Sequence, residues 1–248
     1  MRTLLLQLDS SRLPSVFDRV VAYDAGADEV LSYGGIAEAD VRDLIHGCIF
    51  TRGPKDLKHT AVFIGGTDMA AGEVRGQRAV VVAGTGPVGL RAAGLLAKAG
   101  AEVVITSRKP DAGERARQLV TKRFGGTVRA LPMADAREAA RALEGAALVL
   151  NAGPAGVQLV PQAAWAKRPG LKAAADVNAV PPLGIEGIET MDDGAAKQGV
   201  ACFGALAIGN LKMKIHKACV ARLFERNDLV LDAETIADVA RELLAPQR

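Results

Sequence analysis

The chain has 248 residues, of which 49% are hydrophobic, 24% charged and only 4% aromatic. This composition is close to ordinary globular usage and excludes general disorder, while the length allows one large domain or two small ones. The net charge of +3 comes from 31 basic and 28 acidic residues, and this excess is too small to indicate a nucleic-acid-binding surface.

The cysteines and the N-terminus indicate the cellular compartment. Cys48, Cys202 and Cys219 are widely spaced and form no CxxC pair, which is typical of reduced thiols. The N-terminal apolar run reaches Asp9 too soon for a signal peptide. No apolar stretch approaches the roughly 18 residues that a membrane span requires. We therefore expect a soluble cytoplasmic protein with no membrane partner.

The first part of the chain predicts a small α/β domain over residues 1–77. Short apolar runs predict strands, and apolar residues at helical spacing predict helices. The expected strands are 3–8, 29–33 and 59–64, and the expected helices are 14–25, 37–46 and 68–74.

A stronger alternation of strand and helix signals begins at residue 79, and it predicts a parallel sheet with helices on both faces. We therefore expect a Rossmann-type, doubly wound α/β domain over residues 78–226. The C-terminal helix, within 227–248, is expected to pack back on the N-terminal domain. The expected strands are 79–83, 103–106, 127–131, 147–150 and 172–177, and the helices are 90–99, 112–124, 135–143, 206–224 and 233–244.

A glycine motif follows the first strand of this second domain. In a GxGxxG motif, the first glycine allows a tight turn, the second leaves room for a pyrophosphate, and the third lets the helix pack closely. The start of the helix offers N–H groups to the phosphates. The alternative is a glycine-rich turn of a plain α/β domain. The expected cofactor-binding residues are Gly84, Thr85, Gly86, Pro87, Val88 and Gly89.

The end of the next strand distinguishes the two nicotinamide cofactors. NAD-binding proteins usually carry an acidic residue about 20 residues beyond the motif, on the ribose. This chain instead has Ser107, Arg108 and Lys109 there. Arg108 can pair with a 2′-phosphate, Ser107 can donate a hydroxyl hydrogen, and Lys109 adds a second charge. The motif therefore predicts NADP as the cofactor, the alternative being a solvated basic turn.

Two further strand ends are expected on the nicotinamide side of the cofactor. Asn151, Ala152 and Gly153 follow one buried strand, and a turn-rich segment with Asn178 follows the next. Ligands bind at this edge of such sheets. An ordinary turn between strand and helix would look similar.

Several sequence runs together resemble one family over nearly the whole chain. This family is the NADP-dependent methylene-tetrahydromethanopterin/methylene-tetrahydrofolate dehydrogenases of one-carbon metabolism. The runs that carry the resemblance are 14–18, 23–28, 51–55, 63–73, 83–89, 161–165, 176–185 and 203–216.

The resemblance implies a hydride transfer from a reduced pterin carrying a methylene group to NADP, which leaves the methenyl form. It also implies that the two domains face each other across a cleft, that Arg108 meets the 2′-phosphate, and that Lys212 has a phosphate-side role. Members of the family carry a further segment between a run such as the one ending at Glu73 and the first strand of the second domain. This chain lacks that segment.

Candidate substrate residues are few. Because nitrogen lone pairs stabilise the methenyl cation, no catalytic base is essential, and nearby carboxylates could add electrostatic stabilisation. Asp18 and Asp68 are the candidates, although each could be a helix-start carboxylate with local bonds. Lys55 could meet an acidic pterin tail or be solvated. No histidine has the spacing of a metal site.

Three functions therefore stay open. The first is a working NADP-dependent pterin dehydrogenase. The second is a non-catalytic NADP(H)-binding protein derived from the same family, and the third is another NADPH-dependent pterin reductase. The small N-terminal region is expected to need a neighbour to cover its apolar surface, so we expect a homo-oligomer.

Overall fold

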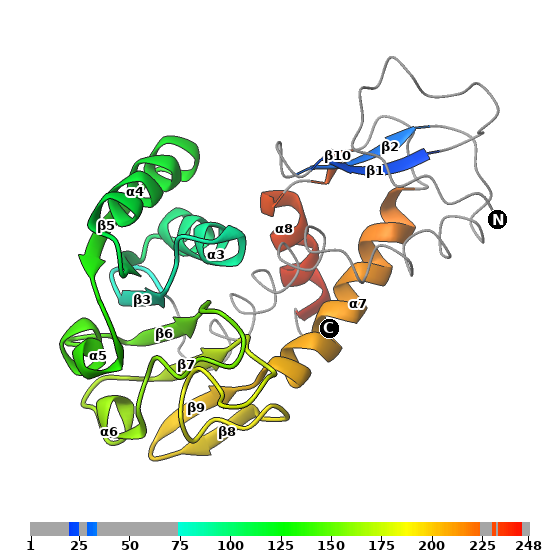
Figure 1. Ribbon diagram of the computed structural model, residues 1–248. Coiled ribbons are helices and arrows are strands. Elements are labelled where there is room, and N and C mark those ends of the chain that lie inside the picture. Colours follow the sequence, from blue (N-terminus) through cyan, green and yellow to red (C-terminus); the bar gives the residue numbers. More distant parts are fainter. Residues whose placement is uncertain (1–19, 25–28, 34–73, 224–229, 232, 245–248) are drawn as a thin grey trace. The chain divides into compact units, whose positions relative to one another are not determined.

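A computed structural model describes residues 20–24, 29–33, 74–223, 230–231 and 233–244 of the chain (Figure 1). The chain divides into two compact units, one of residues 1–61 with 212–248 and one of residues 62–211. The domain boundaries expected after residues 77 and 226 stay predictions. None of the helices in these described ranges is long and apolar enough to span a membrane.

Among the described residues of the 62–211 unit, seven strands form one sheet. Their order across the sheet is β5-β4-β3-β6-β7-β9-β8, and all neighbours are parallel except β8 and β9. The strands are β3 (Arg78–Val82), β4 (Glu102–Ser107), β5 (Thr127–Pro132), β6 (Leu148–Asn151), β7 (Ala173–Asp176), β8 (Asp193–Lys197) and β9 (Val200–Phe203).

The direction of strand succession reverses beside β3. The chain moves from β3 to β4 and β5 toward one edge, and then from β6 to β7 toward the other. The alternating, mostly parallel sheet confirms the predicted Rossmann-type α/β fold class. In such sheets ligands bind outside the carboxyl ends of the strands, at the point of reversal.

Helices cover both faces of this sheet (Figure 1). Helices α3 and α4 contact each other and the strands β3, β4 and β5, whereas α5 and α6 contact each other on the opposite face. Gly94 lets α3 approach α4, since a side chain there would overlap the ring of Phe124. The helices are α3 (Pro87–Lys98), α4 (Pro110–Phe124), α5 (Ala139–Ala142) and α6 (Gln162–Trp165).

The core beneath α5 and α6 is built mainly from aliphatic side chains around one tryptophan. Trp165 is fully buried, and its indole N–H donates to the carbonyl oxygen of Glu186 at 2.9 Å. Val80, Val149 and Ala174, from three neighbouring strands, belong to the same cluster. Strands that are apolar on both faces are what a sheet covered on both sides requires.

The unit of residues 1–61 and 212–248 contains a second sheet. In the part that the structure describes, this sheet joins three strands in the order β1-β2-β10. β10 pairs antiparallel with β2, with Val230 opposite Leu31, so residues 230–231 of the C-terminal region share a sheet with the N-terminal region. The elements are β1 (Val20–Asp24), β2 (Glu29–Tyr33), β10 (Val230–Leu231) and α8 (Ala233–Leu244).

One long helix, α7 (Ala205–Leu223), runs from the larger unit into the smaller one. Within the smaller unit, α7 and α8 are joined by an ion pair between Arg222 and Glu242. The expected helices 206–224 and 233–244 correspond closely to α7 and α8.

Three expectations from the sequence were wrong or incomplete. The expected helix 14–25 is wrong where the structure describes it, because residues 20–24 form β1, antiparallel to β2. Val20, Val21 and Tyr23 are residues that favour a strand. The expected helix 135–143 is a 3-10 turn followed by the single turn of α5. The β8–β9 hairpin was not predicted, since β8 has the polar, small-residue sequence DGAAK.

Candidate cofactor site

The carboxyl ends of β3, β6 and β7 lie in one row. The register places Val82 opposite Asn151, and Asn151 opposite Asp176. These positions are at the reversal of strand order, so their loops line the edge at which a ligand is expected.

The glycine loop, residues 83–89, leaves β3 by a constrained turn. Ala83 has a φ of 52°, which is uncommon for a residue with a side chain. Its N–H donates to Oγ1 of Thr106 at 3.0 Å, and the N–H of Gly84 donates to the carbonyl oxygen of Thr106 at 3.1 Å. Thr106, which is buried, therefore holds both residues of the turn.

Two glycines of this loop are required by packing. A side chain at Gly89 would place its Cβ 2.4 Å from the Cα of Gly84. A Cβ at Gly84 would lie 2.9 Å from Val81 and 3.0 Å from Ile105. The start of α3 therefore lies directly on the end of β3, as expected for the first and third glycines of the motif.

Gly86 is different, because the protein itself gives no reason for a glycine there. A Cβ at Gly86 would meet no atom within 4 Å, and its backbone φ of −83° suits any residue. A side chain at Gly86 would occupy open space at the N-terminus of α3. That space fits the close approach of a pyrophosphate to the backbone.

The start of α3 suits an anion. Gly86 is the N-cap and supplies no side-chain cap, Pro87 is the first helical residue, and the first turn contains no acidic residue. The N–H groups and the positive dipole end of a helix N-terminus attract a phosphate. Thr85 and Val88, also expected to bind the cofactor, are half-buried in the same loop.

The basic turn, residues 107–109, connects β4 to α4. The Ser107 hydroxyl donates to the carbonyl oxygen of Lys109 at 2.9 Å and accepts from the Lys109 N–H at 3.2 Å. Since its one hydrogen is used inside the turn, the Ser107 side chain shapes the turn and leaves Arg108 and Lys109 as exposed cations.

A half-open pocket of about 220 Å³ lies beside this turn, between α4 and β5, with Ser107 and Glu114 in its lining. Hydrogen bonds from Arg117 and Gln118 lower the pKa of Glu114 to about 2. The Glu114 carboxylate is therefore held in an ion pair with Arg117 at 2.6 Å.

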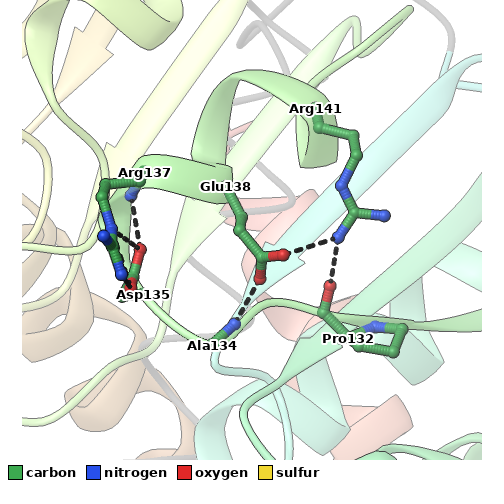
Figure 2. A network of polar contacts seen from close by, with 6 residues as sticks. All are labelled: Pro132, Ala134, Asp135, Arg137, Glu138 and Arg141. Carbon is green, nitrogen blue, oxygen red and sulfur yellow. Dashed lines mark hydrogen bonds and ion pairs between the residues drawn. The ribbon is translucent and has the colours of Figure 1, made fainter.

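The segment after β5 is bonded to the basic turn and contains a polar network of its own (Figure 2). The N–H of Met133 donates to the carbonyl oxygen of Ser107 at 2.9 Å. Glu138 accepts from the Ala134 N–H at 2.5 Å and from Arg141 at 3.2 Å, and Arg141 also donates to the carbonyl oxygen of Pro132 at 3.0 Å. The loop beside the basic turn is thereby fixed.

The same network includes an exposed ion pair. Asp135 pairs with Arg137 (Figure 2), and hydrogen bonds from Arg137 lower the pKa of the Asp135 carboxyl. Asp135 also accepts from the Arg137 N–H at the start of the 3-10 turn, which explains why a helical turn begins there.

A buried amide–carboxylate cluster, formed by Asn151, Asp176 and Asn178, occupies the ends of β6 and β7. The Asn151 side-chain amide donates to Oδ1 of Asp176 at 2.8 Å, and its oxygen accepts from the Gly153 N–H at 3.1 Å. Asp176 also accepts from the N–H groups of Asn178, at 3.0 Å, and Ile185, at 2.8 Å. All three side chains of the cluster are buried.

Asn178 joins the two loops that follow these strands. Its side-chain oxygen accepts from the N–H of Val180 at 2.9 Å and from that of Gly156 at 3.4 Å. Its amide donates to the carbonyl oxygen of Pro182 at 3.2 Å. Both Asn151 and Asn178 therefore use their side chains to hold the protein's own backbone.

Fewer contacts are described for the remaining expected site residues, and three of these residues lie outside the described ranges. Ala152 and Gly153 lie half-buried directly after β6. Lys212 is buried on α7 but belongs to the other compact unit, so its phosphate-side role stays a prediction. Asp18, Lys55 and Asp68 lie outside the described residues.

Two residues that organise this edge were not predicted from the sequence. Thr106 holds the glycine loop, and Asp176 is the centre of the amide–carboxylate cluster. Both are polar residues at or near the end of an otherwise apolar strand, buried to 1% exposure. A polar residue at that position in a buried strand is the signal that could have found them.

Comparisons with known proteins agree on one family. A family model described as "Methylene-tetrahydromethanopterin dehydrogenase, N-terminal" matches residues 16–82. The chain is 42% identical to "Bifunctional protein MdtA" of Methylorubrum extorquens, over 98% of this chain and 99% of that protein. It is 30% identical to "NAD(P)-dependent methylenetetrahydromethanopterin dehydrogenase" of the same organism, with the same coverage.

These alignments also reveal a difference in length. The alignment with MdtA has 285 positions and runs almost from end to end of both proteins, whereas this chain has 248 residues. At least 37 positions of the alignment, the difference between the two numbers, therefore have no residue of this chain. The chain lacks internal sequence that this relative has.

The similarity to solved structures supports the fold. The transhydrogenase from Sinorhizobium meliloti superimposes with a TM-score of 0.50 at 18% identity, over 77% of this chain and 52% of that one. At this identity the likeness concerns the arrangement of helices and strands alone.

Proposed function

The chain belongs to the methylene-tetrahydromethanopterin dehydrogenase family, and from this premise we propose that it is an NADP-dependent dehydrogenase. The proposed reaction moves a hydride from methylene-tetrahydromethanopterin, or from methylene-tetrahydrofolate, to NADP and leaves the methenyl form. The observation that carries the cofactor part is Gly86, a glycine that neither packing nor backbone conformation requires.

The preference for NADP over NAD rests on charge. Arg108 and Lys109 are exposed at the end of β4, the strand next to the glycine loop. Guanidinium pairs with a phosphate through two parallel hydrogen bonds, whereas an uncharged ribose hydroxyl gains much less from it. The relative whose name states a cofactor is called NAD(P)-dependent, so the proposed preference for NADP rests on Arg108 and Lys109.

In the proposed complex the described residues bind and orient. The start of α3 holds the pyrophosphate, the basic turn holds the adenosine 2′-phosphate, and the loops after β6 and β7 frame the nicotinamide half. When bound, the cofactor supplies the hydride acceptor. Because the two nitrogens beside the methylene carbon stabilise the cation that forms, correct positioning is the main task of the protein.

Four further residues, of which Asp18, Lys55 and Asp68 lie outside the described ranges, complete the proposal. Asp18 and Asp68 would stabilise the developing cation, Lys55 would meet an acidic tail of the pterin, and Lys212 on α7 would add a positive charge near the phosphates. The role of Lys212 follows from the sequence resemblance, whereas those of Asp18, Asp68 and Lys55 follow from their charge.

The test is an absorbance assay of NADPH formation. Purified protein is mixed with NADP and either methylene-tetrahydromethanopterin or methylene-tetrahydrofolate, and the expected result is a rate with at least one of them. The Gly86→Val variant is the matched control, and it should abolish the rate while the protein stays folded. A wild-type protein that binds NADPH but forms none from either substrate would contradict the proposed reaction.

The shorter chain favours a second candidate, an NADP(H)-binding protein without turnover. At least 37 aligned positions of MdtA have no counterpart here, and the sequence places the shortfall beside the N-terminal domain, on the expected pterin side. NADPH binding with no turnover of either pterin would support this candidate.

A further inference from the structure

The amide–carboxylate cluster lies on the side of the glycine loop opposite the basic turn. β3 is paired with β4 on one side and with β6 on the other, and the basic turn follows β4. A dinucleotide with its pyrophosphate at α3 and its adenosine half toward β4 must extend its other half toward the ends of β6 and β7. Asn151 and Asp176 end these two strands.

The Asp176 carboxylate is fully engaged by N–H donors. It accepts hydrogen bonds from the Asn151 side chain and from the backbone of Asn178 and Ile185, at 2.8 to 3.0 Å, and it is 1% exposed. A buried carboxylate is tolerated when hydrogen bonds replace its hydration. Because its oxygens are used in this way, Asp176 holds neighbouring groups in place and does not itself reach a ligand.

The carboxylate determines how the Asn151 amide is oriented. Oδ1 of Asp176 accepts from the Asn178 N–H and lies 2.8 Å from the amide nitrogen of Asn151, so the NH₂ end of Asn151 faces Asp176. The amide oxygen of Asn151 then faces Gly153 and accepts its N–H at 3.1 Å. In this way Asp176 fixes the backbone of the loop after β6 through one intermediate side chain.

Close packing leaves no room for another position of the Asn151 amide. A Cβ at Gly184 would lie 1.7 Å from the amide nitrogen of Asn151 and 3.0 Å from the Asp176 carboxylate. The segment after β7 therefore lies against the pair, and the Ile185 N–H closes it from that side. Asn178, held by Asp176 through its N–H, joins the segment to the loop after β6 at Gly156.

The geometry points to Asp176 as a positioning residue that sets the two loops around the nicotinamide half of the bound cofactor, through Asn151 and Asn178. This inference rests on the proposed function. It predicts that disturbing Asp176 alters the nicotinamide half of the site and leaves the adenosine half unchanged, although the two halves belong to the same sheet.

The experiment compares two ligands on the full-length protein. NADPH occupies both halves of the site, whereas adenosine 2′,5′-bisphosphate occupies only the pyrophosphate and basic-turn half. Affinities are measured by calorimetry for wild type and for Asp176→Asn, in which an amide NH₂ group replaces one accepting oxygen and faces an N–H donor. The fluorescence emission of bound NADPH reports on the environment of its nicotinamide ring.

A second variant and a control accompany Asp176→Asn. Gly184→Ala displaces the Asn151 amide while keeping every polar atom of the cluster, so it tests the inference even if Asp176→Asn does not fold. Asp192→Asn is the control, because Asp192 is also a buried carboxylate, bonded to the Glu189 N–H and to Lys197, directly before β8, which β9 separates from β7.

We expect Asp176→Asn and Gly184→Ala to weaken NADPH binding by about tenfold, to change adenosine 2′,5′-bisphosphate binding by less than about twofold, and to shift the emission toward that of free NADPH. Asp192→Asn should leave the ratio of the two affinities unchanged. An unchanged ratio in folded Asp176→Asn, or equal weakening of both ligands, would overturn the inference while the proposed function stands. Wild-type protein that binds neither ligand would overturn both.

Discussion

The two sides of the glycine loop use their polar side chains in opposite ways. On the β4 side, the basic turn leaves Arg108 and Lys109 exposed and uses its buried hydroxyl for its own backbone. On the β6–β7 side, Asn151, Asp176 and Asn178 are buried and bonded to the protein. One side therefore presents charge to a ligand, while the other presents backbone that buried side chains hold in place.

This difference predicts how mutations divide between binding and stability. Exposed cations contribute little to folding, so changing them should alter ligand affinity alone. Buried groups with several hydrogen bonds contribute to folding, so changing them should alter stability as well. The glycine loop between the two sides contains one residue whose change should alter stability, Gly89, and one whose change should alter affinity alone, Gly86.

The largest effect is expected within the glycine loop. Gly89→Ala places a methyl group 2.4 Å from the Cα of Gly84, where only backbone movement can make room. We expect the free energy of unfolding to fall by about 3 kcal/mol, measured by urea denaturation.

Gly86→Ala is the matched control for that variant. A methyl group there meets no protein atom, so stability should change by less than about 0.5 kcal/mol, while NADPH binding weakens by about tenfold, a loss of roughly 1.4 kcal/mol. If Gly86→Ala binds NADPH as tightly as wild type, the open space at α3 is not the pyrophosphate site.

The next largest effect is expected at the basic turn. Arg108→Glu replaces a phosphate partner by a repelling charge, so NADPH affinity should fall about a hundredfold while NADH affinity changes by less than about fivefold. The thermal midpoint should not move, because Arg108 is exposed. Arg115→Glu, the same charge change at an exposed position of α4, should leave both affinities nearly unchanged. A similar loss in both variants would point to overall charge as the cause.

A pH dependence of stability is expected from the buried Cys202 thiol. Burial, assisted by the Asp192 carboxylate, raises the pKa of the Cys202 thiol on β9 from 9.0 to about 11. Between these values the unfolded thiol loses its proton and the folded one keeps it, so stability falls as the pH rises from 9 to 11, by on the order of 2 kcal/mol.

Unfolding measured across this pH range checks that expectation. Cys202→Ala should show a smaller fall in stability than wild type over the same range. Equal falls in the two proteins would mean that the Cys202 thiol does not contribute to the pH dependence.

The smallest effect is expected in the exposed network after β5. Arg137 is 90% exposed and pairs with Asp135, so Arg137→Ala should change stability by less than about 0.5 kcal/mol. NADPH affinity should stay within about twofold of wild type. A larger loss of affinity would mean that this loop, as well as the basic turn, contacts the cofactor.

The sequence predicted the position in the fold of those parts of the candidate site that depend on neighbouring residues. The uninterrupted apolar run of β3, the glycine loop and the basic turn are all local patterns, and each lies where it was expected. Asn151 and Asn178 were also selected, as cofactor-binding residues. The hydrogen bonds that use up their side chains come from partners up to 25 residues away, which no local pattern reveals.

The same reason explains the errors in the fold. The apolar spacing of residues 14–25 suits a helix locally, but Val20–Asp24 pair with β2 as β1, and pairing depends on a second strand. The sequence DGAAK of β8 has no apolar alternation, and its pairing with β9 makes it a strand. Tertiary pairing overrides weak local preference in both cases.

The central claim is that the exposed cations after β4 select the cofactor. The most direct measurement is a titration of wild-type protein with NADPH and with NADH under the same conditions. We expect NADPH to bind about a hundredfold more tightly. Equal affinities for the two cofactors would contradict the claim.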